Sequence, residues 1–145
     1  DFAGVLLYQT LHAVGFADIA ESISADDGLT LRGARITNAV KCLPPANKPL
    51  PVEIRECSRF LAAEIASLSS VRVLLALGRI AHDSTLDALG IKRSAATFGH
   101  GHEHALDCGR TLIDSYHCSR YNTQTRRLSP AMYGKVLQRA RQLSD

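Results

Sequence analysis

One histidine stands at the start of an unusually cationic loop. His117 follows the apolar, strand-like run "TLIDSY" and precedes a polar stretch, 118–128, before Ser129 and Pro130 open a helix. That stretch carries three arginines, Arg120, Arg126 and Arg127. An imidazole at the end of a buried strand can donate a hydrogen bond to a developing oxyanion or act as a general acid or base. A lone histidine is often structural, but the arginines beside it favour a functional role.

Asn38 is a second candidate, because it lies in a stretch, 29–40, that begins with alternation and is rich in β-branched residues. Its side-chain amide presents a hydrogen-bond acceptor and a donor together. That pair can bond to a base edge or to an imide. The alternative is an asparagine that satisfies the backbone of a nearby loop.

Three histidines alternate along "GHGHEHAL": His100, His102 and His104. On a strand they would face one side, as the ligands of a transition metal could. No cysteine or carboxylate stands beside them to complete a site, and Glu103 would point the other way. A surface loop with fortuitous histidines is therefore the preferred interpretation.

The cysteines give a weak signal from spacing alone. Cys42 and Cys57 are separated by 14 residues, whereas metal sites usually contain a close pair. The chain shows no basic-then-apolar leader, so disulfides are not expected. Free thiols are the simplest interpretation of the spacing.

Charge is distributed unevenly. The formal net charge is +3, yet Tyr116 to Leu143 holds six basic residues and no Asp or Glu. Such an excess suits phosphate binding, because Lys and Arg displace condensed counterions. A solvated basic face on the last helix is the alternative.

Helical and strand patterns alternate along the chain and must position these residues. The predicted order is helix 3–16, strand 29–40, helix 53–68, strand 71–77, helix 79–89, strand 110–116 and a helix from Ser129. Such alternation indicates an α/β protein with a parallel sheet and helices on both faces. Sites in these sheets lie beyond the carboxyl ends of the strands.

The bulk properties predict a single domain, 1–145, with no run approaching the ~20 apolar residues of a membrane span. Asp1 stands directly before a helix with no initiator Met. We therefore expect that the first strand of the sheet is missing from this chain.

Three segments together resemble the uracil-DNA glycosylase superfamily, and its iron–sulfur type-five branch (UDGb) most. They are "NAVKCLPP" from Asn38, "LLALG", and "HCSRYNTQTRRLSP" from His117, while "DFAGVLLY" from Asp1 looks like the branch's TGD-x-x-G segment. The resemblance implies a three-layer α/β/α sandwich around a central parallel four-stranded sheet. It also implies hydrolysis of the N-glycosidic bond of uracil or a related deaminated base in DNA, which leaves an abasic site after base flipping.

The resemblance further implies roles for single residues. Asn38 pairs with the uracil edge, His117 hydrogen-bonds O2 of the leaving uracil, and Asp1 positions water or stabilises the sugar cation. The implied DNA-binding residues are Ser119, Arg120, Tyr121, Asn122, Gln124, Arg126 and Arg127. Among them Tyr121, Asn122 and Gln124 are candidates to fill the gap that the flipped base leaves.

Cys42 and Cys57 become, on this resemblance, two of the four ligands of a structural [4Fe–4S] cluster, the other two preceding Asp1. The family's His-Pro-Ser motif reads His117, Cys118, Ser119 here, which removes the fixed φ of proline. Arg126 stands where the family usually has glycine, which adds charge and costs flexibility.

The implied protein is a cytosolic monomer of a bacterium or archaeon that acts on double- or single-stranded DNA and no membrane. Two alternatives stay open. One is a non-catalytic DNA-binding relative. The other is a metal-dependent hydrolase that uses His100, His102 and His104.

Overall fold

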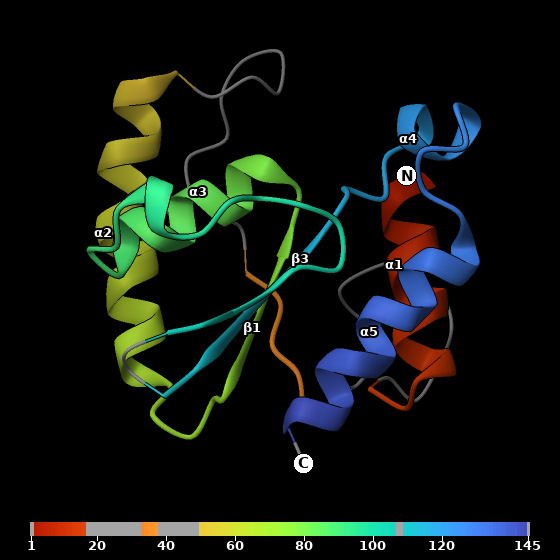
Figure 1. Ribbon diagram of the computed structural model, residues 1–145, viewed down its shortest axis with the longest axis horizontal. Helices are drawn as coiled ribbons and strands as arrows, with labels where there is room; N and C mark the ends of the chain where they lie inside the picture. The colour runs from red at the N-terminus through yellow and green to blue at the C-terminus, as the bar shows by residue number, and fades with distance from the viewer. Residues whose placement is uncertain (1, 17–32, 38–49, 107–108, 145) are drawn as a thin grey trace, which may run out of the picture.

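The computed structural model describes residues 2–16, 33–37, 50–106 and 109–144 (Figure 1). The elements are α1 (Phe2–Ala13), α2 (Pro51–Ser67), β1 (Val73–Leu77), α3 (Arg79–Ala88), the 3₁₀ turn η2 (Arg93–Ala95), β2 (Glu103–Ala105), β3 (Thr111–Ser115), α4 (Arg120–Gln124) and α5 (Pro130–Ser144).

The elements form three layers (Figure 1). Strands β1, β3 and β2 lie in that order in one sheet. Helices α1 and α5 lie side by side on one face, and α3, with α2 beside it, lies on the other. The α/β sandwich predicted from the sequence is confirmed.

β1 and β3 run parallel, with Val73 opposite Thr111 and Leu77 opposite Ser115. Both strands therefore end at the same edge of the sheet. β2 pairs with β3 in the antiparallel direction, with Glu103 opposite Ile113. The connection from β2 to β3 has only five residues, 106–110, whereas a parallel connection needs a crossover of about a dozen.

The resemblance implies a sheet of four parallel strands, with the first strand expected to be missing from this chain, and the observed sheet differs in the direction of one strand. Within the described residues it has three strands, and one of them is antiparallel. The predicted strand 29–40 is wrong for residues 33–37, which form no regular strand, and its other residues lie outside the described part of the chain.

Local signals explain where the helices begin. Ser129 Oγ accepts a hydrogen bond from the backbone N–H of Met132, which caps α5, and Pro130 occupies the first position. Pro51 opens α2, and the Glu53 carboxylate accepts from the Leu50 N–H. α4 was not predicted, although Ser119 caps it in the same way through Asn122 N–H.

The two faces of β3 pack against different helices. Leu112 packs with Leu86 of α3, and Ile113 packs with Val136 of α5. Because side chains two residues apart share a face of a strand, Asp114 points with Leu112 toward α3. None of the helices in the described part of the chain combines the length and apolar character needed to cross a bilayer.

Candidate active site at the ends of β1 and β3

The ends of β1 and β3 are joined directly. The Gly78 N–H, just after β1, donates to the Ser115 carbonyl at 2.8 Å. Gly78 has a φ of 102°, and a Cβ placed on it would lie 3.3 Å from the Cβ of His117. A glycine is required here because the backbone is left-handed and His117 lies so close. The joint places His117 beside the start of α3.

His117 is solvent-exposed, yet its surroundings desolvate the imidazole and lower its pKa below the usual value. No side chain among the described residues hydrogen-bonds its ring. Its carbonyl oxygen accepts a hydrogen bond from Asn122 Nδ2 at 2.9 Å, which ties the histidine to α4. The site therefore presents a neutral imidazole that can donate a hydrogen bond to a ligand.

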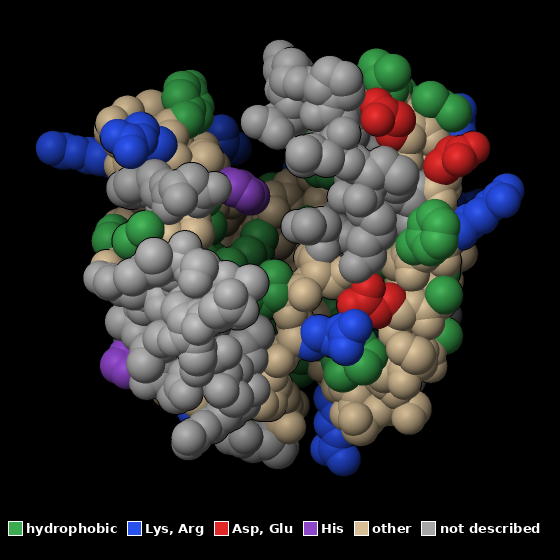
Figure 2. Space-filling view, turned by 180° about the vertical axis from the view of Figure 1, so that it is seen from behind, with side chains coloured by type: hydrophobic (Ala, Val, Ile, Leu, Met, Phe, Trp, Pro, Cys, Tyr) green, Lys and Arg blue, Asp and Glu red, His purple; other side chains and the backbone are tan. Residues whose placement is uncertain are grey.

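The cationic loop lies next to this histidine. Lys and Arg side chains project at the corner of the molecule that α4 forms (Figure 2). The Arg127 guanidinium lies over the Tyr116 ring, 4.6 Å from its centre, and the Tyr121 side chain is 72 % exposed. Arg126 has a φ of 62°, the left-handed conformation that glycine adopts without strain. The fold thus holds Arg126 in a backbone conformation that glycine adopts more easily.

Part of the basic segment serves the fold itself. Arg139 binds Glu103 through two hydrogen bonds of 2.9 and 3.2 Å, and Arg141 donates to the Val14 carbonyl. The excess of positive charge that faces a ligand is therefore smaller than the sequence count of +6 suggests.

Cys118 belongs to the core rather than to the site surface. Its buried thiol lies 3.4 Å from the Ala3 carbonyl and 3.4 Å from the Tyr133 hydroxyl, and burial raises the pKa of the thiol. Cys118 thereby links the loop to α1 and α5.

The three alternating histidines do not converge on one metal. His100 Nδ1 accepts from the Tyr116 N–H at 3.0 Å, and His102 Nδ1 lies 3.2 Å from the Thr97 carbonyl. His104 Nε2 instead contacts the Asp114 carboxylate at 2.8 Å. The expectation that no carboxylate lies beside them was wrong, because Asp114 is near only in space.

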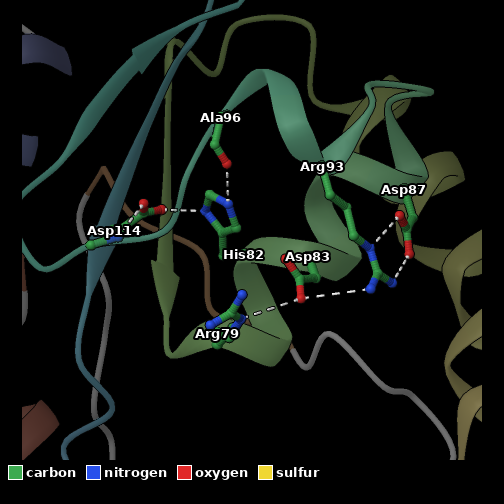
Figure 3. Close-up of polar contacts among 8 residues, drawn as sticks. Arg79, His82, Asp83, Asp87, Arg93, Ala96 and Asp114 are labelled. Atoms are coloured by element: carbon green, nitrogen blue, oxygen red, sulfur yellow. Dashed lines mark hydrogen bonds and ion pairs between the residues drawn. The ribbon is translucent and has the colours of Figure 1, made fainter.

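Asp114 is the centre of a buried network that sequence reasoning missed (Figure 3). Its carboxylate also lies 2.6 Å from His82 Nδ1 and accepts from the Gly99 N–H at 3.3 Å. The other ring nitrogen of His82 lies 2.8 Å from the Ala96 carbonyl. An aspartate inside the apolar run "TLIDSY" was the available signal, because a buried carboxylate requires partners.

The side chains of His82, His104 and Asp114 lie close enough together to hold a cation, since one ligand atom from each lies within 4.8 Å of the others. Each of those atoms, however, already faces a hydrogen-bond partner within the network. The geometry is that of a satisfied polar cluster.

The structure brings together one group of the predicted residues. His117 and the implied DNA-binding residues, from Ser119 to Arg127, lie together beyond β3. Cys57 lies in α2, on another part of the fold. Asp1, Asn38 and Cys42 lie outside the described residues.

Comparison with known proteins supports the resemblance. Residues 1–141 match the Uracil DNA glycosylase superfamily. The chain is 46% identical over 144 residues to a type-5 uracil-DNA glycosylase of Thermus thermophilus, covering 99% of this chain and 65% of that protein. It is 37% identical over 146 residues to the type-5 enzyme of Mycobacterium bovis, covering 99% and 54%.

A type-5 uracil-DNA glycosylase of Pyrobaculum aerophilum is 37% identical over 134 residues, covering 92% of this chain and 58% of the relative. The chain thus spans between half and two thirds of the length of these relatives. With the superfamily match along nearly the whole sequence and the α/β sandwich in agreement, the chain belongs to the uracil-DNA glycosylase superfamily.

Proposed function

We propose that this chain, as a single domain 1–145, carries the site of a DNA glycosylase that hydrolyses the N-glycosidic bond of uracil or a related deaminated base. The observation that carries the proposal is the position of His117. Its neutral imidazole stands at the joined ends of β1 and β3, beside a cationic loop. The names of the relatives supply the substrate class.

His117 would act on the leaving group. When the glycosidic bond breaks, uracil departs with negative charge on O2, and an N–H donor aimed at that oxygen lowers the barrier. Because its surroundings lower the pKa of His117, the ring donates without needing a second proton. Asp1 would position the attacking water or stabilise the sugar cation, and Asn38 would accept from N3–H of uracil and donate to O4.

The loop after His117 would hold the flipped-out nucleotide. Tyr121 is the strongest candidate to fill the gap in the base stack, because its ring is exposed on α4. Asn122 is less suited, since its amide already donates to the His117 carbonyl. Ser119 accepts the capping bond of α4 and still has a hydroxyl proton for a phosphate.

Arg120, Gln124, Arg126 and Arg127 would complete the contact with single- or double-stranded DNA. Positively charged side chains on a short helix and in the turn after it suit a sugar–phosphate backbone, since they release its counterions. We propose that the protein works as a monomer in the cytosol.

Cys42 and Cys57 would bind a [4Fe–4S] cluster, for which thiolates are the usual donors. The cluster would supply no step of the hydrolysis and would only hold the chain together. Cys118 is not a further ligand, because its thiol is buried between Ala3 and Tyr133.

The test is single-turnover cleavage of a labelled uracil-containing duplex by this chain and by a version extended upstream of Asp1. Iron content is measured for both proteins. We expect excision by an iron-bearing protein and a loss of roughly 100-fold or more in His117→Ala with DNA affinity retained. Binding without excision by either protein would instead identify a non-catalytic DNA-binding relative.

A further inference from the structure

We propose that Asp114, together with His82 and His104, is a positioning group for His117. The catalytic part of this inference rests on the proposed function. Asp114 lies three residues before His117 on the same strand end, and its side chain is 0% exposed. The carboxyl group contacts three partners, His82 from α3, His104 from β2 and the Gly99 N–H from the loop before β2.

The hydrogen-bond pattern around His82 fixes the number of protons. One ring nitrogen faces a carboxylate and the other faces the Ala96 carbonyl, and both of these groups are acceptors. Two protons must therefore lie between the three groups, either both on the imidazole or one on the imidazole and one on Asp114. In both cases the bridge from β3 to Ala96 is complete.

Asp114 also holds the backbone that leads to His117, through its carboxylate and through its own main chain. Three hydrogen bonds connect residues 99–102 to Asp114. The Gly99 N–H donates to the carboxylate, and the Gly101 N–H donates to the Asp114 carbonyl at 2.8 Å. The Asp114 N–H donates to the His102 carbonyl at 3.0 Å. This arrangement places His100 so that its Nδ1 accepts the N–H of Tyr116, the residue directly before His117.

The other side of His117 is held through α3. His82 N–H donates to the Gly78 carbonyl at 3.1 Å, in the first turn of the helix, and Gly78 lies against His117 Cβ. The contact between His82 and Asp114 thus also fixes the position of the start of α3. Both elements that flank His117 are thus connected to Asp114, α3 through the carboxylate and residues 99–102 through the carboxylate and the backbone.

Asp114→Asn separates geometry from charge. A neutral His82 that donates to the Ala96 carbonyl leaves Nδ1 as an acceptor for the asparagine N–H. The asparagine oxygen can then accept from His104 and Gly99. This variant keeps the three side-chain hydrogen bonds, whereas Asp114→Ala removes all three and leaves only the bonds of the Asp114 backbone.

The matched control is Arg110→Ala, on the same face of the sheet and just before β3 begins. Arg110 donates to the backbone carbonyls of Ile65, Leu68 and Val71, far from the site end of the strand. Its loss should lower thermal stability without slowing the reaction.

The experiment compares single-turnover excision of uracil, affinity for an uncleavable uracil duplex, and hydrogen exchange of the Tyr116 amide, in full-length protein. We expect Asp114→Ala to slow excision by roughly 100-fold with unchanged affinity, because small displacements of a catalytic group carry such costs. Asp114→Asn should restore most of the rate, and Arg110→Ala should retain it. If Asp114→Ala does not fold, His104→Ala, rescued by His104→Gln, replaces it.

Equal slowing by Asp114→Ala and Arg110→Ala, or no rescue by Asp114→Asn, would overturn the inference. If the parent protein excises no uracil, the proposed function fails, and Tyr116 exchange alone decides the positioning. Faster hydrogen exchange of the Tyr116 amide in Asp114→Ala, and a return to the parent rate in Asp114→Asn, would support the positioning role. An unchanged exchange rate in Asp114→Ala would overturn it.

Discussion

The two faces of α3 handle charge in opposite ways (Figure 3). On the inner face, His82 meets Asp114 with both side chains at most 1% exposed. On the outer face, Asp83 and Asp87 pair with Arg93, and Asp83 also lies 3.9 Å from Arg79, whose side chain is 78% exposed. One ten-residue helix therefore carries both a buried pair and a surface chain of ions.

The difference teaches where a polar contact determines structure. A surface pair exchanges freely with water, and its net contribution is small. A buried pair contributes little more stability than an apolar replacement of both residues. The loss of one partner, however, leaves the other charge buried without a partner or water, which costs several kcal/mol. The inner face of α3 therefore fixes the positions of its partners, whereas the exposed pairs of the outer face do not.

The largest effect should follow from breaking the inner pair. In His82→Ala the Asp114 carboxylate keeps His104 and Gly99 but loses its shortest contact. We expect a loss of about 3–5 kcal/mol in the free energy of unfolding, measured by urea denaturation. A loss as small as that of a surface pair would show that water reaches the carboxylate.

A backbone change near the site should have a smaller effect of opposite sign. Arg126→Gly relieves the left-handed φ of 62° and should stabilise the protein by up to about 1 kcal/mol. The same change removes a cation, so DNA affinity should fall and its salt dependence should flatten. Arg126→Asn serves as the control, since asparagine also tolerates this conformation. A destabilised Arg126→Gly would contradict the strain argument.

Breaking the outer chain should cost little. Arg93→Ala removes the contacts to Asp83 and Asp87, and we expect a loss of at most about 0.5 kcal/mol that shrinks further in salt. Urea denaturation at two ionic strengths measures it. A cost that approaches that of His82→Ala would remove the contrast between the two faces.

The smallest effect concerns His117, which is exposed but desolvated. Because its pKa is lowered in the folded state, the unfolded chain binds the proton more readily. The free energy of unfolding should therefore fall as pH drops below the ordinary histidine value, and change no further below the folded pKa. His117→Gln should flatten this slope slightly. A slope identical to that of the parent would mean that the imidazole is not desolvated.

Local sequence patterns determined most of the elements and the family. Capping by Ser129, the turn at Gly78 and the apolar run before it depend on neighbours in the chain, so spacing reveals them. For the same reason the motif that begins at His117 could be recognised in the sequence. Its loop lies beyond the carboxyl end of β3, where sites in such sheets are expected.

Tertiary structure alone decided which side chains meet. Asp114 and His82 are 32 residues apart, and Arg139 and Glu103 are 36 apart, so no local spacing relates them. The antiparallel direction of β2, by contrast, follows from its short connection to β3 once both strands are placed. Backbone elements arise from short-range hydrogen bonds, whereas the partners of a buried charge are chosen by packing.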